Sequence, residues 1–559
     1  MEETKIDYSH NEKEPEKEDG NIEYKLKLVD KTEERIEKLA SQMRFRTEEG
    51  DGECIYNLGV EDKGQITGIT EIEYEETINV LKSAASMNNY TITLLSSTVI
   101  TKKSKKENRE LRVYEVLVRE KNDNKYIDMR VAIAGSVDSG KSSFTGAIVN
   151  GIKDDGRGLS RSTIFNYPHE IKTGRTSSIS HQILGFDDKG DIVNYRSSCG
   201  KMSWPDIVRS SSKIITFFDL AGHEKYLKTT ILGLTSAPPN LCLIMIGANR
   251  GILRMTREHI FLCITLGIPF AFVITKIDMI GENENVYKET LTTINKILKS
   301  PIVRRIPVKV NNIQDVLTCA KQIHTESIVP IFNVSNVTGE GVDMILKFLN
   351  VLKKEGCVKA DLSSIGVKMF IDYIWNVTGI GIVIGGNLVS GKIKVGDRLF
   401  LGPNNNEYES VVVKSIHCKR VPVQSVSYGS YVCLGLKKVT NRKSIRRGNV
   451  LVSDVNQQLF VRKFDAEIKV LHSHTTTIRV GYSPVLNALS IRQTASLKEI
   501  ISKMSSRPTD NEDKLLRTGD QAIATFEFAY QAEYLPVGTK ILLSEGRTKV
   551  VGVVKNIYN

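Results

Sequence analysis

One loop constrains this chain more than any other feature. Residues 135–142 read Gly-Ser-Val-Asp-Ser-Gly-Lys-Ser, which matches the pattern G-x-x-x-x-G-K-S/T. The apolar run before it, residues 129–135, predicts a β-strand, and the residues after Lys141 predict a helix. In that context the backbone amides of the loop and the N-terminus of the helix surround phosphate groups. The sequence therefore predicts an α/β domain with a phosphate site at the end of one strand.

Two residues of this loop have distinct expected roles. Lys141 is expected to reach the β- and γ-phosphates of a nucleotide, and the Ser142 hydroxyl to ligate Mg²⁺. The whole predicted phosphate loop is Gly135, Ser136, Val137, Asp138, Ser139, Gly140, Lys141, Ser142 and Ser143.

A second motif follows the apolar run 212–220. It contains Asp219, Gly222 and His223. The Asp219 carboxylate suits a water molecule bound to Mg²⁺, and Gly222 lets a backbone amide approach the γ-phosphate. His223 is then placed to orient the attacking water, although an isolated histidine near a turn would more often be a surface residue. Because ligands bind beyond the carboxyl ends of the strands in such sheets, this motif should lie beside the phosphate loop.

Two further motifs point to the base of the nucleotide. The runs 240–249, 268–278 and 328–336 predict three more strands. Thr275, Lys276 and Asp278 end one of them, and Ser335, Asn336 and Val337 end another. A carboxylate at Asp278 accepts two hydrogen bonds from guanine that adenine does not offer. Lys276 would pack over the base, and backbone amides of residues 335–337 would meet the guanine oxygen, so GTP and GDP are the expected ligands.

The rest of the chain divides into domains of different character. Residues 1–25 are acidic and predict a disordered tail. Residues 26–125 predict a small α+β domain. Within it we expect a turn-rich start at 56–69, a helix over 75–90 and strands over 91–100 and 111–120. Residues 126–355 alternate strands and helices and predict a P-loop domain with a parallel sheet. Residues 360–456 and 460–559 carry short strands with regular turns and predict two β-barrels. The expected fold class is multidomain α/β plus all-β.

Charge is distributed unevenly along the chain. Residues 365–559 contain 27 Lys and Arg against 15 Asp and Glu, which equals the entire net charge of +12. The basic residues singled out are Lys414, Lys419, Arg420, Lys437, Lys438, Arg442, Lys443, Arg446, Arg447, Arg492, Arg547 and Lys549. Such a density favours RNA as a partner, while ordinary solvation remains the alternative for each single residue.

No apolar run is long enough to span a membrane, and the cysteines show no zinc or disulfide spacing.

The ordered set of motifs resembles a translational GTPase. The strings ITFFDLAGHEKYLKTT, NVTGE, SIRQTA and EGRTKVVG are similar to the GTP-binding protein 1 family, relatives of elongation factor 1-alpha and elongation factor Tu. The resemblance implies a GTPase domain followed by two β-barrels, and aminoacyl-tRNA or another RNA on the ribosome as the partner, with links to mRNA turnover. It also implies that Thr176 ligates Mg²⁺ and senses the γ-phosphate, with Thr173 as its competitor. His223 would orient water on the ribosome, and Asp138 would help hold a monovalent cation.

Two features depart from the wider class. Its guanine motif usually begins with Asn, whereas this chain has Thr275, whose hydroxyl is not expected to supply the bonds of an amide to the loop and the base. The resemblance also implies two switch regions, the first around Thr176 and the second over residues 222–226. Residues 187–211 are expected to be an insertion between them, of unknown purpose. No arginine is placed by a motif to stabilise the transition state, so Arg157, Arg161 and Arg175 are only candidates.

The expected function is a GTP-hydrolysing switch acting with RNA or ribosomes, slow without an activating partner. A cytoplasmic monomer is expected, with no membrane association. One alternative is an adaptor that recruits RNA-decay proteins and for which turnover is secondary. Another is a GTPase that activates a metabolic enzyme, which the basic C-terminal third disfavours.

Overall fold

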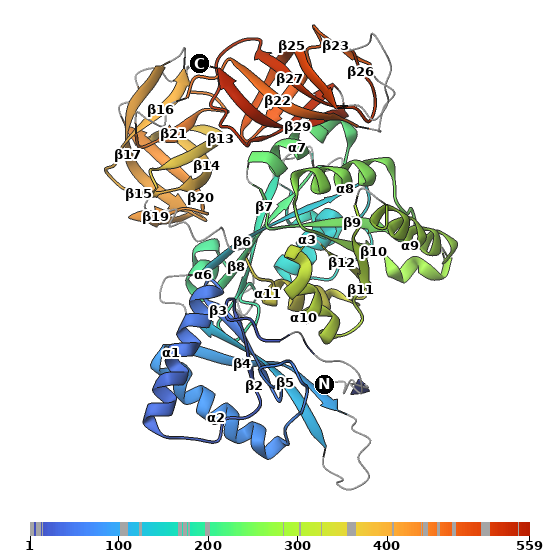
Figure 1. Ribbon diagram of the computed structural model, residues 1–559, viewed down its shortest axis with the longest axis vertical. Helices are drawn as coiled ribbons and strands as arrows, with labels where there is room; N and C mark the ends of the chain where they lie inside the picture. The colour runs from blue at the N-terminus through green and yellow to red at the C-terminus, as the bar shows by residue number, and fades with distance from the viewer. Residues whose placement is uncertain are drawn as a thin grey trace.

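The computed structural model arranges the chain in three tiers, with the N-terminal domain at one end, the P-loop domain in the middle and two barrels side by side at the other end (Figure 1). The residues that the structure describes are 5–6, 13, 15–100, 110–121, 126–165, 170, 176, 179–195, 202–236, 238–282, 284–300, 303–325, 327–354, 365–404, 407–437, 439, 445–454, 459–471, 477–504, 515–545 and 547–558.

The N-terminal domain is a five-stranded sheet of order β1-β4-β5-β3-β2 with two helices packed on it. Its elements are β1 (Lys5–Ile6), β2 (Ile22–Lys25), α1 (Glu33–Glu49), β3 (Glu53–Leu58), α2 (Glu71–Met87), β4 (Tyr90–Ile100) and β5 (Leu111–Glu120). Helix α2 starts earlier than the predicted 75–90 because Thr70 and Glu73 form a capping box, which satisfies two free amides of the first turn. The predicted strands at 91–100 and 111–120 are confirmed as β4 and β5.

Two predictions for this domain need correction at their boundaries. Residues 22–25 do not belong to a disordered tail, because β2 pairs in parallel with β3. In addition, the turn-rich segment predicted at 56–69 begins three residues too early, because residues 56–58 end the buried strand β3, whereas residues 59–69 do form turns and isolated bridges. A strand buried on both faces shows no alternation of apolar and polar residues, so the pattern that identifies a strand was missing.

The P-loop domain is a seven-stranded sheet of order β11-β12-β10-β9-β6-β8-β7. Its strands are β6 (Ile127–Gly135), β7 (Ser180–Phe186), β8 (Lys213–Asp219), β9 (Leu241–Gly247), β10 (Phe270–Thr275), β11 (Ile306–Lys309) and β12 (Ile328–Val334). Its helices are α3 (Lys141–Asn150), α4 (Leu159–Ser162), α6 (Trp204–Ser210), η1 (Glu224–Tyr226), α7 (Leu227–Ser236), α8 (Arg254–Leu266), η2 (Ile277–Glu282), α9 (Glu284–Leu298), α10 (Ile313–Gln322), η3 (Ile323–Thr325) and α11 (Val342–Val351).

Helices cover both faces of this sheet. Residues of α3, α10 and α11 form a core on one face, and residues of α7, α8 and α9 form a core on the other. The five strands predicted from the sequence are confirmed as β6, β8, β9, β10 and β12. The predicted all-parallel sheet is corrected to a mixed one, because the edge strand β7 runs antiparallel to β8.

Both predicted barrels are confirmed. In the first, six strands close through the pairing of β16 with β17, and the second closes in the order β22-β27-β25-β24-β28-β29. The first contains β13 (Lys368–Val377), β14 (Gly381–Ser390), β15 (Lys392–Lys394), β16 (Arg398–Asn404), β17 (Glu407–Cys418), β18 (Val421–Val423), β19 (Ser425–Ser427), β20 (Tyr431–Lys437) and β21 (Val450–Val452). The second contains β22 (Lys463–Val470), β23 (Ile478–Arg479), β24 (Val485–Ala488), β25 (Ile491–Met504), β26 (Leu515–Leu516), β27 (Gln521–Phe528), β28 (Lys540–Glu545) and β29 (Arg547–Tyr558).

A buried ionic network joins the N-terminal domain to the P-loop domain. Glu53 of β3 accepts hydrogen bonds from Arg119 of β5 at 2.8 and 3.1 Å and from Lys213 of β8 at 2.8 Å. Arg119 and Lys213 also donate to the carbonyl of Asn350 at the end of α11, at 2.9 and 2.7 Å. Lys213 begins the strand that Asp219 ends, so this network anchors the far end of a strand that leads to the predicted nucleotide site.

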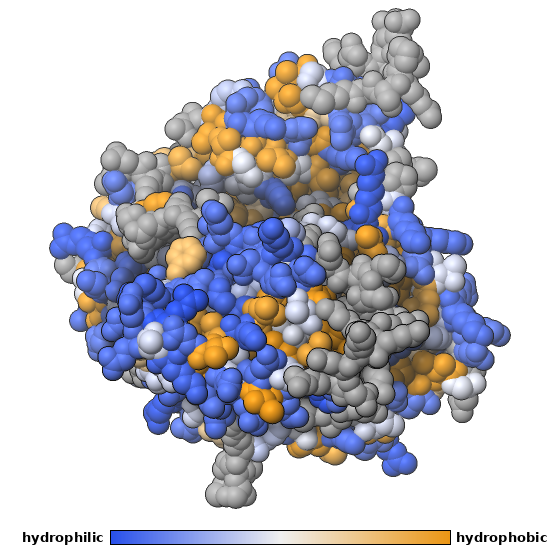
Figure 2. Space-filling view, turned by 60° about the horizontal axis from the view of Figure 1, so that its bottom comes forward, coloured by the Kyte–Doolittle hydropathy of each residue, from blue (hydrophilic) through white to orange (hydrophobic). Residues whose placement is uncertain are grey.

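The surface seen from the N-terminal end is largely hydrophilic, and most of the described cysteines lie in the interior. Figure 2 shows the molecule with its N-terminal end toward the viewer, and hydrophilic side chains cover much of this face. Apolar side chains form patches, which are more frequent beside the hollow in the upper part of the view. Among the described residues, no helix combines the length and the apolar character needed to cross a bilayer. The six described cysteines are unbridged, and five of them are buried.

Candidate nucleotide site

The phosphate loop connects β6 to α3 through backbone conformations that favour glycine. Gly135 has φ of 145° and Gly140 has φ of 81°. A Cβ atom on Gly135 would lie 2.5 Å from the carbonyl oxygen of Met245, which is closer than real contacts allow. Both glycines of the motif are therefore required by the path of the backbone as well as by the approach of a ligand.

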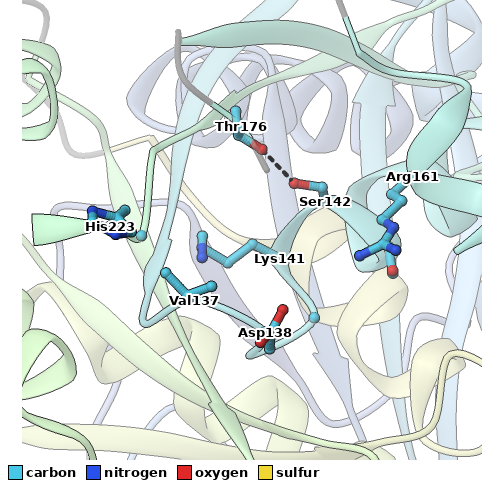
Figure 3. Close-up of a pocket in the computed structure, with 10 residues that line it drawn as sticks. Val137, Asp138, Lys141, Ser142, Arg161, Thr176 and His223 are labelled. Atoms are coloured by element: carbon cyan, nitrogen blue, oxygen red, sulfur yellow. Dashed lines mark hydrogen bonds between the residues drawn. The ribbon is translucent and has the colours of Figure 1, made fainter. Parts of the chain in front are cut away.

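Three oxygen-bearing side chains meet at the start of α3, and two of them, Ser142 and Thr176, are drawn in Figure 3. The Ser142 hydroxyl donates to Asp219 Oδ2 at 2.6 Å and lies 2.8 Å from the Thr176 hydroxyl. Thr176 in turn donates to the same carboxylate oxygen at 3.4 Å. These are the three residues predicted to hold Mg²⁺, and they come from three separate segments of the chain. Thr173, the competitor of Thr176, lies outside the described residues.

The chemistry of this cluster fits a divalent cation. Mg²⁺ prefers hard oxygen ligands such as hydroxyls and carboxylates. Asp219 is fully buried, and its Oδ1 has no hydrogen-bond partner within the described part of the chain. Burial raises the pKa of Asp219 to about 6, because a buried carboxylate lacks the solvation that stabilises its charge. A cation at this point would supply the missing counter-charge.

Lys141 and Gly222 lie on the other side of the phosphate loop. The Lys141 ammonium is buried and donates to the carbonyl of Ser136 at 2.7 Å. Burial lowers the pKa of Lys141. A Cβ on Gly222 would lie 2.7 Å from the Gly135 carbonyl oxygen and against the Lys141 ammonium. Gly222 is thus the residue that allows the second switch to pack directly on the loop.

His223 lines the same cavity of about 60 Å³ as the phosphate loop. Its Nδ1 accepts a hydrogen bond from the Lys225 amide at 3.1 Å, which makes the imidazole the cap of η1. Figure 3 shows the ring apart from the paired Ser142 and Thr176 hydroxyls. The structure therefore brings His223 to the rim of the site and ties its ring to a neighbouring backbone amide.

The guanine motifs are brought together as predicted. Asp278 Oδ1 accepts a hydrogen bond of 2.5 Å from the Ser335 hydroxyl, which joins the residues after β10 to those after β12. Lys276 adopts a positive φ of 61° between them. The Val337 amide, one of the amides expected to meet the guanine oxygen, donates to Ser335 Oγ at 3.2 Å.

The expectation for Thr275 is corrected in part. Its hydroxyl donates to the carbonyl of Ser139 at 2.9 Å, so this residue does bridge β10 to the phosphate loop. A buried hydroxyl has a single proton to donate. Because that proton is used on the loop, Thr275 has no donor left for the base.

Two residues outside the motifs, His259 and Arg250, contact the phosphate loop. His259 of α8 is fully buried, and its Nδ1 accepts the Gly135 amide at 3.0 Å. Burial lowers the pKa of His259 to about 3, so it stays a neutral acceptor. Asp138 pairs with Arg250 at 3.2 Å, and a monovalent cation held by Asp138 would have to displace that pair. The sequence had no signal for His259 or Arg250, because both reach the loop from more than 100 residues away.

Among the candidate arginines, Arg161 lines the cavity with the phosphate loop. It lies on the short helix α4. Arg157 accepts a hydrogen bond of 3.5 Å from Arg161 through its carbonyl. Arg175 is outside the described residues. Of the two candidates that the structure describes, Arg161 is the one at the site.

The basic residues of the first barrel do not form one free surface. Lys419 is buried in an ion pair with Asp128 at 2.8 Å, and Arg446 pairs with Glu533 of the second barrel at 2.8 Å. Arg447 donates to the carbonyl of Asp372 at 2.8 Å. These three contacts hold domains or strands together, which corrects the expectation that they face a polyanion. Lys414, Lys437 and Arg492 are exposed, whereas Lys438, Arg442 and Lys443 and the side chains of Arg547 and Lys549 lie outside the described residues.

The insertion at 187–211 contacts two other domains. The guanidinium of Arg420 in the first barrel lies 4.4 Å from the ring centroid of Trp204, at the start of α6. The turn after β7 meets the N-terminal domain, where Thr91 donates to Asp188 at 2.7 Å and Arg119 to the Asp187 carbonyl at 3.1 Å. The insertion thus contributes to the contacts that position the outer domains on the P-loop domain.

Comparisons with known proteins agree with this geometry. Residues 128–355 match the family of the elongation factor Tu GTP binding domain. The chain is 40% identical over 544 residues to GTP-binding protein 1 of Xenopus laevis, which covers 96% of this chain and 79% of that protein. It is also 40% identical over 551 residues to human GTP-binding protein 2, covering 97% of this chain and 88% of that protein. Translation elongation factor SelB from Methanococcus maripaludis, solved in complex with a GTP analogue, has a similar fold with a TM-score of 0.53 at 20% identity, over 78% of this chain and 80% of that one.

Proposed function

This chain belongs to the family of GTP-binding proteins 1 and 2, and we propose that it binds GTP with Mg²⁺, hydrolyses it to GDP and phosphate, and acts as a switch with RNA on the ribosome. The observation that carries the first part of this proposal is the meeting of Ser142, Thr176 and Asp219 beside the phosphate loop. These side chains belong to the loop and to both switch regions, so a ligand that contacts all three would order the site around itself.

The residues of the loop would bind the triphosphate. Lys141 would exchange its bond with the Ser136 carbonyl for the β- and γ-phosphates, which are stronger, charged acceptors. When bound, Mg²⁺ would neutralise charge on the phosphate oxygens, held by Ser142, Thr176 and, through water, Asp219. Because Thr176 enters this cluster from the first switch, loss of the γ-phosphate would release it.

His223 would position the attacking water. In this structure its Nδ1 accepts the Lys225 amide, which holds the imidazole at the rim of the cavity. A partner that breaks this bond would free the ring to turn toward the γ-phosphate. We therefore expect hydrolysis to be slow without a partner, because the His223 imidazole that would orient the water is held by the Lys225 amide.

The exposed cations of the barrels support the RNA part of the proposal. Lys414, Lys437 and Arg492 are exposed, unlike Lys419. Contacts between such cations and phosphates release counterions, so RNA binding should weaken steeply with salt. Filter binding of aminoacyl-tRNA with GTP checks this: charge reversal at Lys414 and Lys437 should lower retention and the salt dependence together.

The direct test measures GTP hydrolysis with and without ribosomes and aminoacyl-tRNA. Stimulated turnover should require Mg²⁺ and fall at least a hundredfold in His223→Ala. His417→Ala, which changes a histidine of the first barrel outside the site, should hydrolyse GTP like the wild type. If ribosomes leave the wild-type rate unchanged, the ribosomal role is rejected. If cellular function survives in His223→Ala, the adaptor alternative is the better account.

A further inference from the structure

A cavity of about 210 Å³ lies where the N-terminal domain meets the P-loop domain, apart from the nucleotide site. One wall comes from β2 and β3, and the other from α10 and the residues after α11, at the end of the P-loop domain that faces the N-terminal domain (Figure 1). Apolar side chains such as Ile22, Ile55 and Leu317 line part of it. The basic residues that line it are Lys321, His324, Lys353 and Lys354. Within the described part of the chain, no carboxylate lines this cavity.

Lys353 and Lys354 have no counter-charge of their own. Both are half-buried, and neither ammonium makes an ion pair or a hydrogen bond with the residues that the structure describes. Burial lowers the pKa of Lys353, because desolvation disfavours an ammonium ion, and the charges of Asp51 and Glu53 offset this effect only in part. Since a half-buried cation without a partner is costly, these two lysines favour an anion in the cavity.

The buried acids at this junction already serve other cations. Glu115 accepts hydrogen bonds from Lys13 at 3.2 Å and from Lys321 at 3.3 Å. Glu53 holds the two buried cations of the ionic network described above. Each of these carboxylates therefore balances two positive charges, and neither contacts Lys353 or Lys354. The junction carries an excess of positive charge.

The size and charge of the cavity favour a phosphate group. Its volume equals that of about seven water molecules, which is below the range of pockets for drug-sized ligands. A phosphate group carries a charge of about −1.5 to −2 at pH 7, which two ammonium groups balance. Lysine binds phosphate as a point charge, and apolar walls such as Ile55 concentrate the field of the cations in the cavity. His324 fixes one of these lysines in place, because its Nε2 donates to the Lys353 carbonyl at 2.8 Å.

We propose that this cavity binds a phosphate group, as the free ion or as the phosphomonoester of a small molecule, with Lys353 and Lys354 as its counter-charges. The bound group would contact residues of two domains and so stabilise the docking of the N-terminal domain on α10 and α11. The site lies apart from the phosphate loop and requires no nucleotide there, so it does not depend on the proposed function.

Isothermal titration calorimetry of the full-length protein with inorganic phosphate tests this site. Lys353→Met should bind phosphate at least about tenfold more weakly, as expected for the loss of one hydrogen bond between charged groups. Without phosphate, this variant should unfold at the wild-type temperature or above it, because the substitution removes a half-buried charge that has no partner among the described residues. Lys347→Met is the matched control: Lys347 is an exposed residue of α11 paired with Asp343 at 2.8 Å, and its loss should leave the Kd unchanged.

Two more comparisons make the outcome decisive. Lys141→Ala removes the cation of the phosphate loop and should bind phosphate with the wild-type Kd. Binding that is lost in Lys141→Ala and kept in Lys353→Met would place the anion at the phosphate loop and overturn the proposal, as would a wild-type protein that does not bind millimolar phosphate. Lys354→Met provides the same test if Lys353→Met does not fold. Glycerol 3-phosphate identifies the source of the group: tighter binding than inorganic phosphate assigns a phosphomonoester, and weaker binding assigns the free ion.

Discussion

Replacing Glu53 by Gln would leave two buried cations without the carboxylate that both contact. Arg119 and Lys213 are fully buried, and Glu53 is 3% exposed. Burial alone would raise the pKa of Glu53, but Lys213 and Arg119 lower it below its usual value. The carboxylate is therefore charged in the folded protein, and Gln removes that charge while keeping nearly the same volume.

The expected loss of stability follows from the number of charges left unpaired. Removing one partner of a buried ion pair costs about 3–5 kcal/mol, because the remaining charge is neither solvated nor compensated. Both cations retain hydrogen bonds to the Asn350 carbonyl, which limits the loss. We therefore expect Glu53→Gln to lower the free energy of unfolding by about 3–4 kcal/mol. Adding Lys213→Met should recover part of it, since Met needs no counter-charge.

Urea unfolding and hydrogen exchange of β3, β5 and β8 measure this effect. Exchange resolves the contribution of each strand, which matters because a chain of several domains need not unfold in one step. Glu34→Gln is the matched control: it removes an exposed carboxylate 2.6 Å from Lys38 and should cost less than about 0.5 kcal/mol. Equal effects of the two substitutions would refute the reasoning, because burial would then make no difference.

Three further changes test other parts of the structure. Gly222→Ala should abolish GTP-dependent switching without unfolding the protein, because its Cβ would lie 2.7 Å from the Gly135 carbonyl oxygen; wild-type hydrolysis in this variant would contradict the packing described. Thr275→Val should weaken GTP binding by about 1 kcal/mol through loss of the bond to Ser139, measured by calorimetry, and an unchanged Kd would show that the bond does not support the loop. Burial raises the pKa of Asp372 to about 7, so the folded state binds more protons than the unfolded state from about pH 4 to pH 7, and stability should fall as pH rises across that range. Asp372→Asn should remove this dependence and raise stability at pH 8 by roughly 4 kcal/mol, as thermal unfolding at pH 5 and pH 8 would reveal.

Much of the nucleotide site could be predicted from local sequence. Gly135, Gly140 and Lys141 lie in one short loop whose backbone conformation needs those residue types wherever the loop occurs. Asp219 and Asp278 each end an apolar run, and parallel strands bring their carboxyl ends to one edge of the sheet. The periodicity of apolar residues and the spacing of the motif residues along the chain carry this information, so no knowledge of distant contacts was needed.

Other features depended on side chains that meet across the fold. Lys419 and Arg446 read as part of a basic surface, yet each pairs with an acid from another domain. Likewise, Thr275 keeps its bond to the phosphate loop because β10 ends beside Ser139.

The sequence by itself therefore determined the five strands that lead to the nucleotide motifs, the loops that carry those motifs and that two barrels follow. The tertiary structure decided which charges are buried and which are exposed, and that Thr275 bonds to the phosphate loop. The physical reason is the distance along the chain over which each effect acts. Backbone conformation and strand periodicity are set by neighbouring residues, whereas the partner of a charged or polar side chain is set by packing between segments far apart in the chain.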